Sequence, residues 1–242
     1  MLKQVLMMQI LLYLALHMIK PILLDLVLKR GLQMPQTNYQ GTARFYDLLF
    51  GSTNRWLSRA GVALWPAPPG ARVLDLCCGT GSHLALYHDR PCSLFGLDAS
   101  PGMLAVARAR LGQRAHLDLG DATRLPYAGG TFDLVSCKLA LHEMPPEARR
   151  TVLSEARRVL KADGRILLID FHPGPFDPGR GWLTRGVVVA VEFIAGGEHY
   201  KNQRQFIASG GLPALVREQG LRIETQMLMG GGAFAVQCLS AG

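Results

Sequence analysis

The sequence predicts an α/β protein built on a doubly wound, mostly parallel sheet. Residues 73–81 read Val-Leu-Asp-Leu-Cys-Cys-Gly-Thr-Gly, an apolar run that leads directly into a tight turn, as a buried parallel strand does. A second apolar run, residues 93–98, closes on Asp98. Strand-like and helix-like segments then alternate as far as residue 171. Such alternation is typical of parallel strands joined by right-handed helical crossovers.

Each element of this sheet can be placed from its local pattern. The parallel strands are predicted at residues 72–77, 93–98, 115–120, 131–138 and 164–171, and the helices between them at 82–89, 101–112 and 146–161. Asp163-Gly164 is expected to end the last of these helices. Residues 222–229 and 233–240 flank a run of three glycines, which predicts an antiparallel C-terminal hairpin at the sheet edge and gives seven strands in total.

The front of the chain has a different composition from the rest. Residues 1–31 contain an apolar run from Val5 to Ile19, with Lys3 before it and Lys20-Pro21 after it. A helix that spans a bilayer needs about 20 uninterrupted apolar residues, and no Ala-x-Ala cleavage site follows this run. We therefore expect an N-terminal apolar helix that lies in a membrane interface. The alternatives are a helix packed on the domain or on a partner subunit, and a true span.

Residues 32–70 are expected to form a connector with one helix. Thr42 is the candidate N-cap of that helix. Its apolar residues recur at helical spacing: Phe45, Leu48, Leu49, Trp56 and Leu57. The proline-rich segment 65–70 is a rigid link, and residues 71–242 form the main domain.

Charge and cysteine content favour some partners and compartments over others. The 242 residues carry a formal charge of +8, and residues 1–72 hold eight Lys or Arg against two Asp. This basic, apolar front end suits an anionic membrane surface, whereas no cluster of basic and aromatic residues indicates a nucleic-acid partner. The five cysteines are scattered and odd in number, which argues against a disulfide framework or a metal site. We expect a cytoplasmic protein, peripheral on the inner face of the membrane.

Four motifs, in order, resemble those of the class I S-adenosylmethionine (SAM)-dependent methyltransferases. They are VLDLCCGTGSH (73–83), LFGLDASPGML (94–104), GDATRLPY (120–127) and TFDLVSCKLALHEMP (131–145). The resemblance covers about residues 40–242 and implies a Rossmann-like fold with SAM as cofactor. The motifs are most similar to those of the ubiquinone/menaquinone biosynthesis C-methyltransferases. Bacterial phospholipid N-methyltransferases share much of the pattern, including a stretch like residues 46–51.

The turn and the acid that follows it are the predicted cofactor site. A carboxylate at the tip of the second strand is placed to hydrogen-bond a ribose, and the resemblance implies that Asp98 takes both ribose hydroxyls. It also implies that Gly79, Thr80 and Gly81 shape the turn around the methionine part of SAM. Asp75, at the end of the first strand, is expected near the amino group of the cofactor.

The adenine and the sulfonium are assigned by the same resemblance. Ala99 and Met103 are expected to flank the adenine, Asp121 to accept from its exocyclic amine, and the N–H of Ala122 to serve a ring nitrogen. Lys138 stands where the quinone family usually has a small polar residue. A cation beside a sulfonium is repulsive unless it turns away or is neutralised, so Lys138 is expected to do one of these or to meet an anionic substrate.

Proton-transfer groups are expected at the same edge of the sheet. His142 and Glu143 follow the fourth strand, and His172 follows the fifth. Tyr46, with Tyr39, comes from the front helix, and Tyr200 lies with Glu198 and His199 in a glycine-flanked loop that can form a lid. Each has a structural alternative: a core or capping role for His142 and Glu143, packing for Tyr46, and ordering of a turn for His172.

Residues 172–211 are an insertion between the fifth strand and the tail. Their apolar stretch, residues 187–194, is either a helix packed on the sheet or a lid over a lipophilic acceptor. Together these features predict methyl transfer to a lipophilic, membrane-associated acceptor, first a quinone-type ring. A phospholipid amine is the second hypothesis and a small soluble acceptor the third. A non-catalytic cofactor-binding subunit is the hypothesis from a different class.

Overall fold

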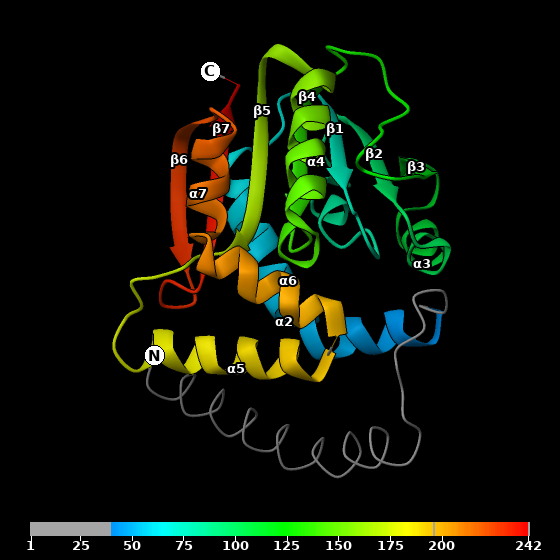
Figure 1. Ribbon diagram of the computed structural model, residues 1–242. Helices are drawn as coiled ribbons and strands as arrows, with labels where there is room; N and C mark the ends of the chain where they lie inside the picture. Colours follow the sequence, from blue (N-terminus) through cyan, green and yellow to red (C-terminus); the bar gives the residue numbers. More distant parts are fainter. Residues whose placement is uncertain (1–39, 196, 242) are drawn as a thin grey trace. The chain divides into compact units, whose positions relative to one another are not determined.

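One seven-stranded sheet organises the fold (Figure 1). Five strands are parallel: β1 (Arg72–Leu76), β2 (Ser93–Asp98), β3 (Ala115–Leu119), β4 (Phe132–Lys138) and β5 (Leu160–Phe171). β7 (Phe234–Ser240) is antiparallel to β5 on one side and to β6 (Arg222–Met229) on the other. The strand order is β3-β2-β1-β4-β5-β7-β6. The predicted doubly wound, mostly parallel sheet with an antiparallel C-terminal hairpin is confirmed.

The structure is a computed structural model that describes residues 40–195 and 197–241, with side chains described from residue 51 on except at 190–195. The chain divides into two compact units, Met1–Gln36 and Thr37–Gly242, and every described residue belongs to the second unit. The expected interfacial helix at residues 1–31 lies outside the described residues, as does Tyr39. Within the described part of the chain, no helix combines the length and the apolar character that crossing a bilayer requires.

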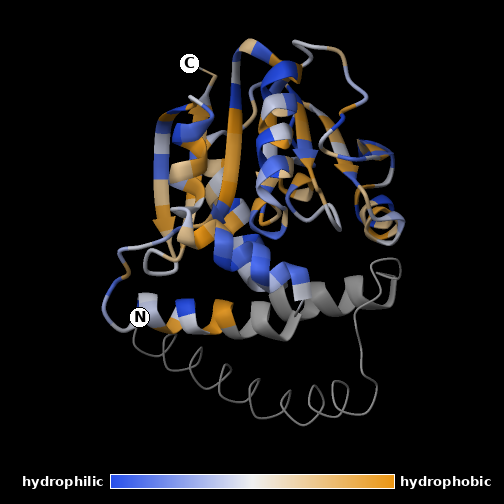
Figure 2. Ribbon diagram, viewed as in Figure 1, coloured by the Kyte–Doolittle hydropathy of each residue, from blue (hydrophilic) through white to orange (hydrophobic). Residues whose placement is uncertain are grey.

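Helices cover both faces of the sheet. They are α2 (Gln40–Leu64), α3 (Pro101–Leu111), α4 (Pro146–Val159), α5 (Arg180–Ala195), α6 (Gly197–Ala208) and α7 (Gly211–Glu218), with short 3₁₀ turns η1 (Leu84–Tyr87), η2 (Gly112–Arg114) and η3 (Leu141–Glu143). Figure 1 shows α4 and α7 in front of the sheet and α2 behind it. Because both faces are covered, the central strands carry apolar runs without alternation, as Figure 2 shows for the lower part of β5. Ile166, Leu167, Leu168 and Ile169 are all buried.

Three predicted boundaries are wrong. The helix expected at residues 82–89 is only the 3₁₀ turn η1. The helix expected at residues 146–161 ends at Val159, because Leu160 already has extended backbone and pairs with Phe132. Thr42 does not cap a helix, because α2 begins two residues earlier, at Gln40.

The insertion forms helices throughout most of its length. α5 contains the apolar stretch 187–194, and α6 and α7 follow it. Glu198, His199 and Tyr200 therefore lie in the first turn of α6, and the prediction that they form a loop is wrong. Gly197, with φ +55°, separates α5 from α6 in a conformation that side chains rarely adopt.

Candidate functional site

Asp98 lies at the end of β2 and braces the glycine turn that follows β1. The backbone N–H of Gly79 donates to its Oδ2 at 2.7 Å, and the N–H of Ser100 donates to its Oδ1 at 2.8 Å. Burial raises the pKa of Asp98, while these two donors oppose the rise. Each carboxylate oxygen keeps a second lone pair, so a bidentate contact with a diol is compatible with this bracing.

The glycine turn provides space for a ligand. Gly79 has φ +54°, and a Cβ built there would meet nothing within 4 Å. Gly81 has φ +71°, and its Cβ would come within 2.8 Å of Leu111 Cδ1, so this glycine allows α3 to pack against the turn. The N–H of Gly81 donates to the carbonyl of Cys78 at 2.9 Å. Both glycine N–H groups are therefore bonded within the protein, and the turn offers open volume beside Asp98.

Arg110 of α3 fixes the middle of this turn. Its Nη1 donates to the carbonyl oxygen of Thr80 at 2.6 Å and to Thr80 Oγ1 at 2.8 Å. Thr80 is buried, and its two bonds to Arg110 hold the turn rigid from the interior of the protein.

Asp75 is a buried carboxyl group at the end of β1. Its Oδ1 accepts from Ser136 Oγ of the neighbouring strand β4 at 2.7 Å. Burial raises the pKa of Asp75 to about 6, and Ser136 and Lys138 oppose the rise while Asp98 adds to it. A cationic ligand at this edge would favour the ionised carboxylate and release the proton.

We expect Asp75→Asn to change how the stability of the cofactor-free protein depends on pH. The pKa of Asp75 in the folded protein is about 6, above the ordinary value of 3.8, so its stabilising contribution is full below about pH 4 and is lost as pH rises through 6. Asparagine removes this loss. The variant should therefore gain up to about 3 kcal/mol relative to the parent between pH 4 and pH 8.

Urea unfolding of both proteins across this range measures the gain. His83 adds a pH dependence that both proteins share. Burial lowers its pKa to about 3, so the stability of both proteins rises with pH. Only the difference between the two curves therefore reports on Asp75. Parallel curves would show that Asp75 is ionised in the folded protein throughout.

Lys138 ends β4 beside the turn. Its Nζ donates to Ser82 Oγ at 3.3 Å, and its charge favours the ionised form of Asp75. The ammonium group thus lies beside the turn and near an acid, Asp75, of opposite charge.

A cavity of about 250 Å³ opens at the carboxyl ends of β1 and β2. It is lined by Cys77, Leu97, Ala99, Gly120, Asp121, Ala122, Thr123, Met144, Ala148 and Val152. Asp121 Oδ1 accepts from the N–H of Thr123 at 2.8 Å, which orients the carboxylate. The predicted adenine residues Ala99, Asp121 and Ala122 lie together here. Met103 does not line this cavity, because it belongs to the first turn of α3, where its N–H bonds to the N-cap Ser100.

The residues at this edge fit SAM. Asp98 would hold the ribose, the mostly apolar cavity with its one carboxylate would hold the adenine, and Asp75 would face the positively charged end. Lys138 would meet the carboxylate of the methionine part. When bound, the cofactor supplies an activated methyl group on a sulfonium.

The candidate proton-transfer residues His142, Glu143 and His172 have different surroundings. His142 is buried, with Nδ1 2.7 Å from Asp170 Oδ1, and its neighbour Glu143 is partly exposed. Nδ1 of His172 accepts from the N–H of Gly174 at 3.2 Å, and the backbone N–H of His172 donates to the carbonyl of Ala233. Burial lowers the pKa of His172.

Two predicted tyrosines lie on helices. Tyr200 is in the first turn of α6, with the guanidinium of Arg204 5.7 Å from its ring centre. Tyr46 is on α2, where the structure describes only the backbone at this position. Neither position assigns the tyrosine a role in the reaction.

Three side chains at this edge were missed from the sequence: Ser136, Arg149 and Asp170. Ser136 and Asp170 lie on β4 and β5 and read as ordinary strand residues, and Arg149 reads as a solvated helix residue. The one available signal was an acid, Asp170, that directly follows the apolar run 166–169 at the carboxyl end of β5, because polar residues at the carboxyl ends of parallel strands tend to be functional.

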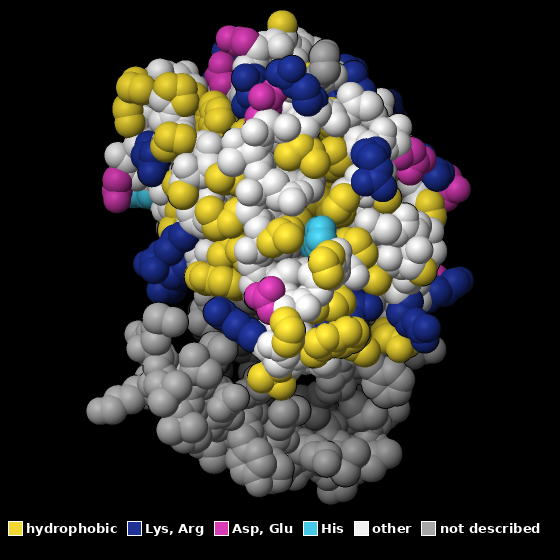
Figure 3. Space-filling view, turned by 90° about the vertical axis from the view of Figure 1, so that its left-hand side faces the viewer, with side chains coloured by type: hydrophobic (Ala, Val, Ile, Leu, Met, Phe, Trp, Pro, Cys, Tyr) yellow, Lys and Arg dark blue, Asp and Glu magenta, His cyan; other side chains and the backbone are white. Residues whose placement is uncertain are grey.

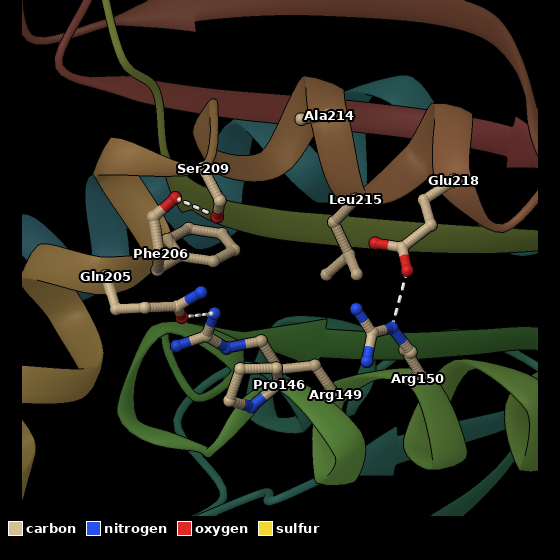
Figure 4. A pocket seen from close by; sticks show the side chains of 9 residues that line it. All are labelled: Pro146, Arg149, Arg150, Gln205, Phe206, Ser209, Ala214, Leu215 and Glu218. Atoms are coloured by element: carbon tan, nitrogen blue, oxygen red, sulfur yellow. Dashed lines mark hydrogen bonds and ion pairs between the residues drawn. The ribbon is translucent and has the colours of Figure 1, made fainter.

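A second, smaller cavity of about 70 Å³ lies between α4, α6 and α7 (Figure 4). Arg149 and Arg150 point toward it from α4, and both are bonded to partners on the facing helices, Gln205 and Glu218. It holds less room than the cavity beside Asp121 and is lined by side chains that join helices to one another. We assign it to packing.

Comparisons with known proteins identify the same segment. Residues 73–164 match a family model described as a methyltransferase domain. The chain is 36% identical over 150 residues to the demethylmenaquinone methyltransferase of Renibacterium salmoninarum, which covers 61% of each chain. It is 32% identical over 166 residues to the demethylmenaquinone methyltransferase of Thermobifida fusca, covering 65% of this chain and 69% of that one.

Sequence coverage and structural similarity limit the conclusions that these matches support. The chain spans 49%, 61% and 59% of the length of three curated relatives that it matches. The crystal structure of a SAM-dependent methyltransferase from Aquifex aeolicus matches with a TM-score of 0.53 at 16% identity, over 75% of this chain and 88% of that one. Identity this low shows the shared fold alone.

Proposed function

This chain belongs to the SAM-dependent methyltransferases, and on that premise we propose that it transfers the methyl group of SAM to a carbon of a quinone-type ring. The observation that carries the proposal is the similarity to demethylmenaquinone methyltransferases across the cofactor motifs and the helices and strands that follow. The cofactor site built by Asp75, Asp98 and the glycine turn supports it.

The geometry supplies what this reaction needs. Methyl transfer from a sulfonium is an in-line displacement, so the protein mainly has to align donor and acceptor and exclude water. Asp98 and the rigid turn fix the nucleoside, and Asp75 with Lys138 surrounds the charged end of the cofactor. The acceptor ring must be in its reduced, dihydroxy form, because only that form makes a ring carbon nucleophilic.

A labelling assay tests the proposal. The full-length protein is incubated with methyl-labelled SAM and a demethylated naphthohydroquinone in detergent micelles, and the lipids are separated by thin-layer chromatography. Label is expected to move with the methylated quinone. Label in phospholipid would support the N-methyltransferase alternative, and label only in water-soluble products would eliminate both lipid acceptors. Cofactor binding by calorimetry without turnover on any extract would indicate a non-catalytic subunit.

We further propose that the protein works at the inner face of the cytoplasmic membrane, where a lipophilic acceptor resides. The basic, apolar composition of residues 1–31 supports this. On the domain itself, hydrophobic side chains gather over β6 and the start of α5 (Figure 3). The exposed ones are Trp182, Leu183, Ile223, Met227 and Leu228, and Trp182 is 64% exposed.

Vesicle sedimentation measures this association. Binding should rise with the fraction of anionic lipid and fall with salt, because basic residues near a charged surface are screened over about 10 Å at 0.1 M salt. Deleting residues 1–30 should release the protein from vesicles while cofactor affinity is kept. If the truncated protein still sediments with vesicles, the membrane contact lies instead on the exposed apolar face shown in Figure 3.

A further inference from the structure

A buried acid–histidine pair lies at the carboxyl edge of the sheet. Asp170, near the end of β5, is fully buried, and its Oδ1 is 2.7 Å from Nδ1 of His142, which is 3% exposed. Asp170 also accepts from the backbone N–H of His142 at 3.3 Å and from that of Phe171 at 2.7 Å. An ionised carboxylate only accepts, so Nδ1 of His142 carries the hydrogen and Nε2 keeps its lone pair.

The loop that carries His142 is fixed from two sides. Arg149 of α4 donates to the carbonyl of Leu141 at 2.8 Å and to that of His142 at 3.4 Å. Asn202 of α6 donates through Nδ2 to the carbonyl of Glu143 at 2.8 Å. The imidazole is therefore held in one place, as a base that acts on a positioned acceptor must be.

A chain of titratable groups leads from His142 to water. Its Nε2 is 3.9 Å from Oε1 of Glu143, and Oε2 of Glu143 is 3.5 Å from Nδ1 of His199 on α6. The side chains of Glu143 and His199 are 44% and 37% exposed. Both gaps exceed an ordinary hydrogen bond, and a small rotation of the Glu143 side chain would shorten them.

We propose that His142, oriented by Asp170, takes the proton that the acceptor loses, and that Glu143 and His199 pass it to solvent. This inference rests on the methyl transfer proposed above. In that reaction the S–CH₃ bond breaks and leaves its electron pair on sulfur, and the ring carbon bonds to the methyl group. The hydrogen of that carbon leaves as a proton, so one proton must depart for each methyl group transferred.

Charged and titratable groups on neighbouring elements surround the pair. Asp170 on β5 and Glu143 on η3 favour the protonated imidazole, and the guanidinium of Arg149 on α4 opposes it. Cys137 on β4 faces Asp170 as a neutral thiol, because its pKa is raised well above the usual value. His199 on α6 completes the set. His142 is the catalytic residue in this scheme, and Asp170 is a positioning residue.

Steady-state kinetics on the full-length protein in weak buffer test the proton path. His142→Ala is expected to lower kcat by about 10²–10⁴-fold with cofactor affinity unchanged. Glu143→Gln and His199→Gln should lower kcat without changing KM, and added imidazole buffer should restore the rate. His88→Gln is the matched control, because His88 is an exposed histidine beside an exposed acid, Asp89, 54 residues before His142. It should keep the parent rate at every buffer concentration.

A second measurement needs no acceptor. Nitrogen-15 NMR of the histidine-labelled protein should show His142 protonated at Nδ1, and Asp170→Asn should shift that tautomer and the pH profile of kcat. His142 protonated at Nε2 would overturn the assignment. Parent rates without a buffer response in the Glu143 and His199 variants would overturn the path while leaving the proposed function intact. An inactive parent protein with the expected tautomer would instead count against the proposed acceptor.

Discussion

Asp98→Ala is expected to weaken binding of SAM by more than about 100-fold. Each charge-assisted hydrogen bond to a ribose hydroxyl contributes about 1.5–3 kcal/mol, and the carboxylate of Asp98 would make two. The substitution also removes the acceptor of the Gly79 and Ser100 N–H groups, at 2.7 and 2.8 Å. The turn thus loses its brace together with the contact, and about 3 kcal/mol in total already corresponds to more than 100-fold.

Isothermal titration calorimetry with SAM and with the demethylated product cofactor measures this loss. Asp98→Asn should weaken SAM binding nearly as much. Its amide nitrogen is a donor, and it would face a backbone N–H that bonds to a carboxylate oxygen in the parent protein. Asp89→Ala is the control, since the side chain of Asp89 is fully exposed and pairs with His88, which is itself exposed. Unchanged affinity in Asp98→Ala would remove the basis for the cofactor site and for the reaction built on it.

Arg149→Met is expected to destabilise the protein by about 3–5 kcal/mol, because it breaks a buried network around a charge. Arg149 is 3% exposed and donates to the carbonyls of Leu141, His142 and Asn202. Its guanidinium also lies 4.8 Å from the ring centre of Phe206. Methionine fills similar volume but donates to none of these carbonyls, and the carbonyl of Leu141 keeps the N–H of Met144 at 3.2 Å. Urea unfolding of the parent and the variant at pH 7 measures the difference.

Arg150→Ala is the matched control on the next residue of α4. Its side chain is 47% exposed and pairs with Glu218, which is also exposed, so its removal should cost no more than about 1 kcal/mol (Figure 4). Equal losses in the two variants would show that Arg149 is solvated and that the loop carrying His142 is held by other contacts. The proposed proton path would then lack its rigid support.

Local sequence patterns placed most strands to within a residue or two. Their apolar runs end just before residues with strong turn preferences, such as Gly79 and Gly81. The second run ends on an acid, Asp98. Boundaries failed where a tertiary contact competes with local preference. Leu160 leaves the helix to pair with Phe132, and no local pattern announces that pairing.

The sequence by itself determined the fold class and the cofactor, because both depend on segments of ten or so residues whose chemistry is local. Only the tertiary structure decided which histidine has a buried acid behind it. His142 and Asp170 are 28 residues apart and meet because β4 and β5 are adjacent strands. Arg149 reads as a surface residue until α6 covers it. Burial and pairing of polar groups depend on which elements pack together, and that is set by long-range contacts that no single segment encodes.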